Sequence, residues 1–437
     1  MAEAIVEKGK IVTAAGTGIN LALGVLYAWS IFKGAIKQSI DAGGPDAFKW
    51  DLAALNDPYA ACCLVFAFAM IFAGKIQDKF GPRATAIIGG LLVGLGFIWV
   101  SQTKEYLSWV LGFGVLAGTG IAFGYSSATP PALKWYPPHK TGKIAGIVVS
   151  GFGLASVYIA PLAQYLLGAW GLQKAMLFFG ITFLFVVCLL SLFLVNPPEG
   201  FVPKDFECRR AKDPARSKIR EKFADTNATA LEMMKTSAFW ILWALFFIGA
   251  GAGLMVIGSV AGIAKKSMGE NAFLAVAILA IGNAGGRIAA GVLSDRIGRK
   301  RTLGAMFSLQ AVLMFAAIPI TVSASNSAPL LVILATLVGF NYGANLSLFP
   351  SYTKDLWGMK NFGVNYGILF SAWGIGGFVM SKVSQALMAS SGTFTTSFTA
   401  AGIILVAGAS LTLMINDEKD ALRRKIAKGI VPVEDTN

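Results

Sequence analysis

Twelve apolar stretches, most of them long enough to cross a membrane as a helix, account for most of this 437-residue chain. They lie at residues 11–36, 56–74, 84–102, 106–133, 142–169, 174–195, 237–264, 271–293, 302–323, 328–351, 362–389 and 396–415. Backbone N–H and C=O groups within a bilayer need partners inside the protein, and a helix supplies them locally. The chain is therefore predicted to be an all-α membrane protein with 12 transmembrane helices.

The composition excludes an ordinary soluble protein, because 55% of the residues are hydrophobic and only 14% are charged. Residues 1–10 carry mixed charge, and the first apolar stretch is longer than that of a signal peptide, so no cleaved leader is expected. The net charge of +14 comes from lysines and arginines in the connections and tails. That placement indicates the positive-inside rule and not a nucleic-acid partner.

A short basic motif occurs twice. GKIQDKFGPR at Gly74–Arg83 returns 217 residues later as GVLSDRIGRK at Gly291–Lys300, each time after an apolar stretch. The chain is thus predicted to consist of two similar halves, each with a GxxxD[RK]xG turn between its second and third helices. Internal repeats of membrane helices are typical of transporters, which bind substrate between the repeats.

Four regions follow from this duplication. We expect a six-helix bundle at 1–196, a cytoplasmic linker at 197–235, a second six-helix bundle at 236–416 and a cytoplasmic tail at 417–437. Basic residues mark the connections expected in the cytoplasm: Lys75, Lys79, Arg83, Arg209, Arg210, Lys212, Arg216, Lys218, Arg220, Lys222, Arg296, Arg299, Lys300 and Arg301. An even helix number places both termini on that side, in the plasma (inner) membrane of a bacterium.

The cysteines and the single histidine give no sign of a metal site. Cys62, Cys63 and Cys188 lie in apolar stretches and Cys208 in the linker, without metal-ligand spacing. His139 follows the fourth stretch and is interpreted as a surface residue and not a proton relay. No cofactor is expected other than a proton as coupling ion.

Arg287 is the strongest candidate for a binding residue, since it lies near the middle of the eighth stretch, in IGNAGGRIAAG. An intramembrane arginine costs about 2.5 to 3.5 kcal/mol on insertion scales and needs a partner. No Asp or Glu lies deep in any of the twelve stretches, so a substrate carboxylate held by two hydrogen bonds is the natural counter-ion. Hydrogen bonds to helix carbonyls alone are the alternative. Asn283, one turn earlier on the same face, is placed to orient the guanidinium or bind the substrate.

Twelve helices in two sixes with this duplicated motif resemble the major facilitator superfamily over the whole chain. In that superfamily the motif charges clamp neighbouring helix ends, a role that the resemblance assigns to Asp78, Arg83, Asp295, Arg296 and Arg299. A carboxylate suits a helix N-terminus, and basic residues can pair with it. The alternative is a plain turn that carries positive-inside charge.

The same resemblance implies that helices 1, 4, 7 and 10 line the central bore. Three tyrosines lie at comparable depth on three of these helices: Tyr27 in the first, Tyr125 in the fourth and Tyr342 in the tenth. A phenol offers an apolar wall with a hydroxyl for a small polar ligand. Any one of them taken singly is better explained by packing, but three on helices that line the bore favour a role in binding.

Several segments resemble the oxalate:formate antiporter and monocarboxylate transporter branch: GVLYAWSIF, KFGPR, FGYSSATPPALKWYPPHKTGKIAG, TSAFWILW, NAGGRIAAGVLSDRIGR, SLFPS and NYGILFSAWG. The branch implies that Arg287 binds the carboxylate. Two departures concern substrate and coupling. Trp373 stands where the oxalate transporter has a lysine, and Asn283 and Ile31 stand where animal monocarboxylate transporters have an aspartate and a lysine.

One central cation neutralises one carboxylate, and a second carboxylate in a low dielectric would stay uncompensated. A monocarboxylate such as lactate or pyruvate is therefore expected, with Phe370 and Trp373 facing its short side chain.

We expect the protein to be a monomeric symporter surrounded by membrane lipid. Carboxylate exchange is the nearest alternative, followed by a non-transporting sensor. A membrane enzyme is disfavoured, because no nucleophile, metal cluster or carboxylate pair lies in the helices.

Overall fold

The computed structural model describes residues 2–198, 200, 201, 203, 227–268, 272–322, 328–391 and 394–415. Within these ranges every regular element is a helix. The first half contains α1 (Ala2–Leu23), η1 (Gly24–Ala28), α2 (Trp29–Ala42), η2 (Leu52–Asn56), α3 (Asp57–Phe80), α4 (Pro82–Ser101), α5 (Tyr106–Trp109), the π-helix η3 (Val110–Ala117), α6 (Gly118–Lys134), η4 (Pro138–Lys140) and α7 (Thr141–Ser191). The predicted linker contains α10 (Ala230–Met234). The second half contains α11 (Ser237–Met268), α12 (Ala272–Ile297), α13 (Arg299–Val322), α14 (Ala328–Trp357), α15 (Phe362–Ser391) and α16 (Thr395–Thr412).

Eleven helical segments of the described chain are long and apolar enough to cross a membrane. One of them contains α7, whose backbone leaves the helical region at Gly171, with φ 78° and ψ 172°. Gly171 separates the two stretches that the sequence predicts at 142–169 and 174–195, so α7 contains two crossings. The prediction of an all-helical protein with 12 crossings is confirmed.

The duplicated motif differs from the predicted turn. α3 continues to Phe80 and α4 begins at Pro82, so Asp78 lies in the last helical turn and only Gly81 joins the two helices. In the second half Gly298 alone joins α12 to α13. Both glycines have positive φ, 84° and 97°, which ends a helix without the clash that a Cβ would cause. We call the end of the molecule that carries Gly81 and Gly298 the loop end.

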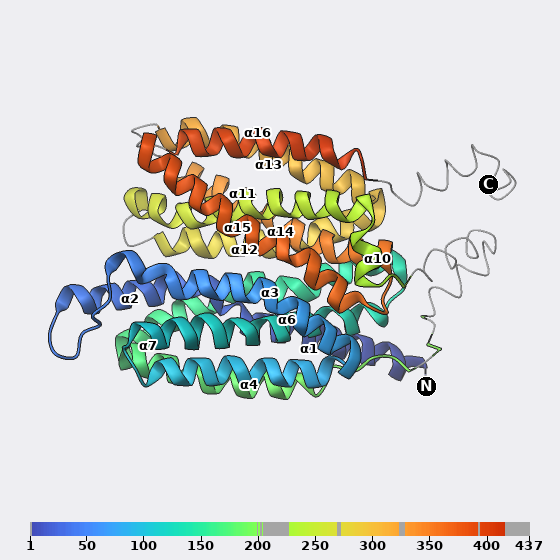
Figure 1. Ribbon diagram of the computed structural model, residues 1–437, viewed down its shortest axis with the longest axis horizontal. Helices are drawn as coiled ribbons and strands as arrows, with labels where there is room; N and C mark the ends of the chain where they lie inside the picture. Colours follow the sequence, from blue (N-terminus) through green and yellow to red (C-terminus); the bar gives the residue numbers. More distant parts are fainter. Residues whose placement is uncertain are drawn as a thin grey trace, which may run out of the picture.

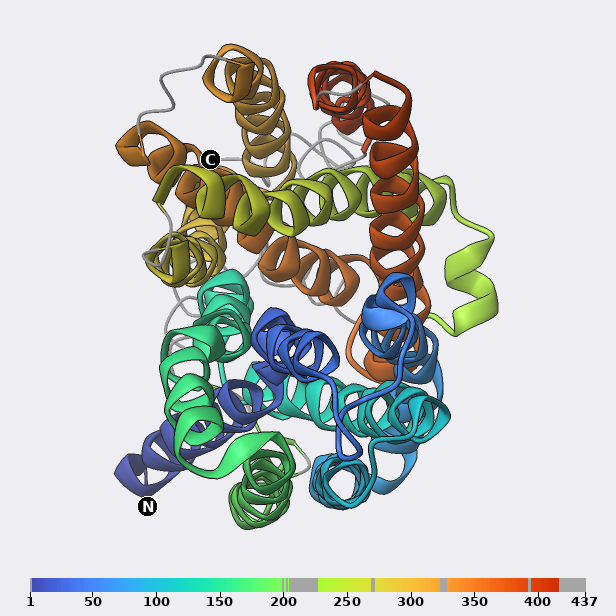
Figure 2. The same ribbon diagram turned by 90° about the vertical axis from the view of Figure 1, so that its left-hand side faces the viewer.

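The spanning helices lie side by side along the long axis of the molecule (Figure 1). Seen along that axis, the helices of the first half lie in one group and those of the second half in another (Figure 2). The most extensive contacts between the groups are those of α3 with α15 and of α7 with α12, and α7 also contacts α14. Any movement of one half relative to the other must therefore slide or separate these pairs.

Part of the predicted linker is visible. Thr229 caps α10 by accepting a hydrogen bond from the backbone N–H of Glu232, and the Thr229 N–H donates to the Glu232 carboxylate, which lowers the pKa of that carboxylate. The side chains of Asn361 and Asn365 both donate to the Ala228 carbonyl, which attaches this segment to the start of α15. The predicted tail at 417–437 and all of 204–226 lie outside the described residues.

Candidate functional site

Arg287 lies on the buried face of α12, where it contacts α7 of the other half. Its side chain has no exposed surface. Nε donates to Asn283 Oδ1 at 2.8 Å, and Nη1 donates to the Val149 carbonyl of α7 at 2.5 Å. Nη2 is buried and has no hydrogen-bond partner among the described residues. A buried guanidinium with two of its three nitrogens engaged thus keeps unused donors on one edge.

The close approach of α7 to α12 holds this arginine in place. A Cβ built on Gly153 of α7 would lie 3.0 Å from Asn283 Oδ1 and 3.3 Å from Arg287 Nε. A side chain at Gly153 would therefore press on the guanidinium and on the amide that orients it. Asn283 is placed as the sequence predicts, one turn before Arg287, and the Val149 carbonyl is a partner that the sequence does not reveal.

Two of the predicted tyrosines connect the halves through hydrogen bonds. The hydroxyls of Tyr27, in η1, and Tyr342, in α14, lie 3.0 Å apart. Trp373 Nε1, in α15, donates to the Tyr342 hydroxyl at 2.8 Å. The Arg287 guanidinium interacts electrostatically with both phenols. Trp373 is thus more than the apolar surface that the sequence suggests, since its indole N–H holds Tyr342.

Aromatic rings from both halves surround this hydrogen-bonded group. The Phe370 ring packs 5.6 Å from Tyr125 and 5.0 Å from Trp373, measured between ring centroids. Phe66 of α3 lies 5.1 Å from Phe370 and 6.0 Å from Phe152 of α7. We call these rings the central aromatic cluster: Tyr27, Phe66, Tyr125, Phe152, Tyr342, Phe370 and Trp373. Phe66 and Phe152 are members that the sequence alone does not distinguish from other packing residues.

Both motif aspartates cap the N-terminus of a helix in the opposite half. Asp78 accepts hydrogen bonds from the backbone N–H groups of Gly363 and Val364, both at 3.0 Å, at the start of α15. Asp295 accepts from Gly142 at 2.9 Å and Lys143 at 2.8 Å, at the start of α7. The first turn of a helix has unsatisfied N–H groups and a positive dipole end, so a carboxylate is favoured there. These four bonds close the loop end.

The motif arginines differ between the halves. Arg299 is buried and pairs with Asp295 at 2.8 Å and with Asp355 at 2.9 Å. Arg83 donates instead to the Leu192 carbonyl at 2.7 Å, so the structure does not bring it to Asp78. Arg296 is exposed at the end of α12. The predicted pairing of carboxylate and arginine is thus present in the second half, where Asp355 is an additional partner.

Nothing in the described part of the chain resembles a metal site, since it has no group of three or more His, Cys, Asp or Glu side chains placed to hold an ion. Cys62, Cys63 and Cys188 are free thiols, and Cys208 lies outside the described residues. His139 lies in η4, in the connection between α6 and α7.

The family model of the Major Facilitator Superfamily matches residues 14–323 and 272–433. The chain belongs to this superfamily. The facilitator is 29% identical over 379 residues to an uncharacterized MFS-type transporter, YhjX, of Escherichia coli strain K12, with 85% of this chain and 86% of that protein covered. It is 27% identical over 356 residues to the oxalate:formate antiporter of Oxalobacter formigenes, with 80% of this chain and 77% of that protein covered. Human monocarboxylate transporter 11 is 25% identical to it over 411 residues, with 92% of this chain and 81% of that protein covered.

Solved structures agree on the fold. A double-tryptophan mutant of XylE has a TM-score of 0.72 at 15% identity, covering 92% of this chain and 95% of that one. The human organic anion transporter MFSD10 has a TM-score of 0.67 at 15% identity, covering 93% of this chain and 99% of that one. These neighbours show the fold, and the match to the superfamily identifies the chain as a multi-pass membrane transporter and not an enzyme. Its relatives fit the branch that the sequence resembles.

The facilitator fold brings the predicted binding residues together at one place. Arg287 and Asn283 bond to each other, and Tyr27, Tyr342 and Trp373 form one hydrogen-bonded group. Tyr125 and Phe370 are in ring contact. Every member of the central aromatic cluster except Tyr27, which is partly buried, is buried against its neighbours. Access to Arg287 therefore requires the two halves to move apart.

Proposed function

We propose that the facilitator carries a short-chain monocarboxylate, of the size of lactate or pyruvate, across the plasma (inner) membrane by alternating access and together with a proton. The observation that carries this proposal is the Nη2 group of Arg287, buried and without a partner in the described structure. An unmade hydrogen bond of a buried donor costs about 1 to 3 kcal/mol, more for a charged group. A carboxylate that bonds Nη2 removes this cost and neutralises the charge.

The aromatic surroundings favour a small substrate with a single charge. Phe370 and Trp373 stack at 22° between their ring planes, and Phe66 packs on both. Such rings suit a methyl or keto side chain and give no counter-charge to a second carboxylate. The names of two relatives agree with small carboxylates, since one is an oxalate:formate antiporter and another a monocarboxylate transporter.

Alternating access requires contacts between the halves that can break and form again. The Tyr27–Tyr342 hydrogen bond is such a contact near Arg287, and the aspartate caps on α7 and α15 are such contacts at the loop end. A bound carboxylate that draws Arg287 away from Val149 would loosen α12 from α7. We propose that this exchange of partners couples binding to opening.

Uptake into liposomes tests the function. With purified protein in the membrane, labelled lactate should enter several times faster under an inward proton gradient than without one. Acceleration by internal carboxylate alone would replace symport with exchange, the mode named for the Oxalobacter formigenes relative. Binding without uptake under either condition would leave a sensor and contradict transport.

The choice of charge is tested by Trp373→Lys, which should raise affinity for oxalate. A second cation near Arg287 would pair with the second carboxylate, and a close charge pair is worth about 1.5 kcal/mol or more, at least about tenfold in affinity. Trp373→Phe is the matched control, because it also loses the bond to Tyr342 but adds no charge. Equal oxalate binding by both variants, measured by calorimetry, would show that charge does not set the selectivity.

A further inference from the structure

A groove between α13 and α16 lies apart from the central site. Its volume is about 890 Å³. Fifteen residues line it: Ile297, Gly298, Lys300, Arg301, Gly304, Ala305, Ser308, Ala311, Val312, Phe315, Val406, Ala409, Ser410, Thr412 and Leu413. Most of those along its middle are small, and a Cβ on Gly304 would lie only 3.0 Å from the Thr412 hydroxyl, so the groove floor is formed by closely packed helices.

The groove faces outward from the helix bundle. α13 and α16 lie at the outer edge of the second half (Figures 1 and 2). Large apolar side chains on its walls are exposed, 62% for Val312, 40% for Phe315 and 72% for Leu413. In a membrane protein such a surface faces acyl chains, because exposure of this kind to water is unfavourable.

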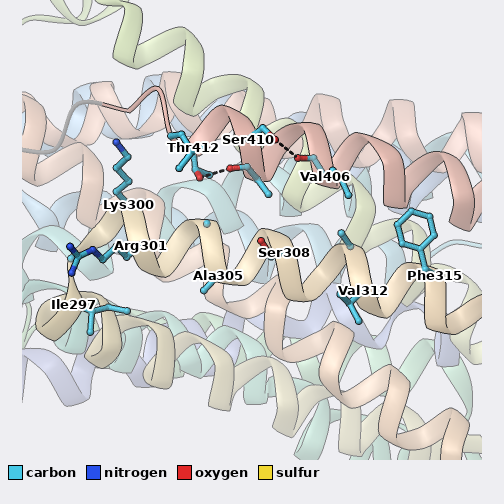
Figure 3. Close-up of a pocket in the computed structure, with 15 residues that line it drawn as sticks. Ile297, Lys300, Arg301, Ala305, Ser308, Val312, Phe315, Val406, Ser410 and Thr412 are labelled. Carbon is cyan, nitrogen blue, oxygen red and sulfur yellow. Dashed lines mark hydrogen bonds between the residues drawn. The ribbon is translucent and has the colours of Figure 1, made fainter.

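The two ends of the groove differ in charge. Lys300 and Arg301, in the first turn of α13, lie at one end, and Phe315 lies at the other (Figure 3). None of the fifteen lining residues is acidic. The positive end of the α13 dipole adds to the two side-chain charges. This end therefore attracts an anion, whereas the rest of the groove suits a hydrocarbon chain.

The groove is long enough for one acyl chain. The 14-residue rise from Arg301 to Phe315 spans about 21 Å along α13. Half of the hydrocarbon core, the depth reached by one chain, is about 15 Å. A phosphate at Arg301 thus leaves room for a whole chain along Ser308 and Val312.

We propose that this groove binds one anionic phospholipid, with its headgroup phosphate against Lys300 and Arg301 and one chain between α13 and α16. Basic pockets between transmembrane helices are suited to anionic lipid headgroups. The lipid would lie directly outside the segment that carries Arg299, whose pairs with Asp295 and Asp355 hold the loop end.

Native mass spectrometry of the purified full-length protein tests this binding. In an equal mixture of phosphatidylglycerol and phosphatidylcholine, the protein should retain phosphatidylglycerol preferentially. Lys300→Gln combined with Arg301→Gln should weaken that retention by about fivefold for each charge removed. Lys75→Gln combined with Lys79→Gln is the matched control, since both lysines are exposed near the loop end of the first half. Equal retention of the two lipids by the unmodified protein would overturn the proposal.

A second variant fills the groove without changing charge. Ser308→Phe places a ring in the chain path and should reduce retention of phosphatidylglycerol, whereas Leu309→Phe, exposed but outside the groove, should not. If millimolar inorganic phosphate displaced the adduct as well as phosphatidylglycerol does, the groove would bind free phosphate and the lipid assignment would fail. A change of oligomeric state with Ser308→Phe would instead identify the groove as an interface between two copies and also contradict it.

Discussion

Arg287→Gln is expected to lower the affinity for lactate by about 30-fold or more and to abolish uptake. The carboxylate loses its counter-charge and its donors in a buried site, and truncating one member of such a pair costs about 2 to 5 kcal/mol. Glutamine keeps an amide that can bond to Asn283 or Val149, so the α7–α12 contact need not be lost. Calorimetry with the purified protein gives the affinity, and thermal unfolding shows that the variant is folded.

Two further variants make the result specific. Arg287→Lys keeps the charge but not the planar fork, so its affinity should lie between those of the unmodified protein and Arg287→Gln. Lys382→Gln removes an exposed cation from α15 and should leave binding unchanged. Unaltered affinity of folded Arg287→Gln would show that Val149 and Asn283 are the only partners that this arginine needs, and carboxylate recognition would have to be placed elsewhere.

The crossings could be predicted from the sequence because a bilayer requires about 20 apolar residues for each of them. Arg287 could be singled out for the same reason, since a charge in such a stretch stands out. Its contact with Val149 could not be predicted, because the two residues are 138 positions apart and meet only through helix packing. Phe66 and Phe152 could not be predicted for a related reason. A phenylalanine in an apolar helix resembles every other packing residue until the neighbouring helices are known.

Part of the contact at the loop end is encoded in the spacing of the repeated motif. The first glycine of each motif copy, Gly74 or Gly291, lies four residues before the aspartate and directly against the helix that the aspartate caps. A Cβ on Gly74 would lie 2.1 Å from the Gly363 carbonyl oxygen. The repeated spacing of glycine and aspartate thus describes one contact, in which the glycine lets a helix approach and the carboxylate binds its first turn.

Gly291→Val is therefore expected to keep the loop end from closing. A Cβ at Gly291 would lie 2.1 Å from the Gly142 carbonyl oxygen, far inside ordinary contact, and both atoms that collide are fixed to helix backbones. Overpacking of this kind costs about 1 to 3 kcal/mol. That energy would shift the balance between the closed and open conformations by about five- to 150-fold, and uptake should fall accordingly.

Gly285→Val is the matched control on the same helix, because a Cβ at Gly285 meets no atom within 4 Å. Spin labels at Lys79 and Arg296, exposed in opposite halves at the loop end, would report the opening as a longer distance in Gly291→Val only. Lactate binding should persist in Gly291→Val, because Arg287 lies one turn further into the membrane and keeps Asn283 as its partner. If the label distance stayed unchanged while uptake fell, the glycine would act by a route other than the α7–α12 contact.

Because Asp295 caps α7 directly beside Gly142, Asp295→Asn should lengthen the same distance by removing the charge that holds the first turn of α7.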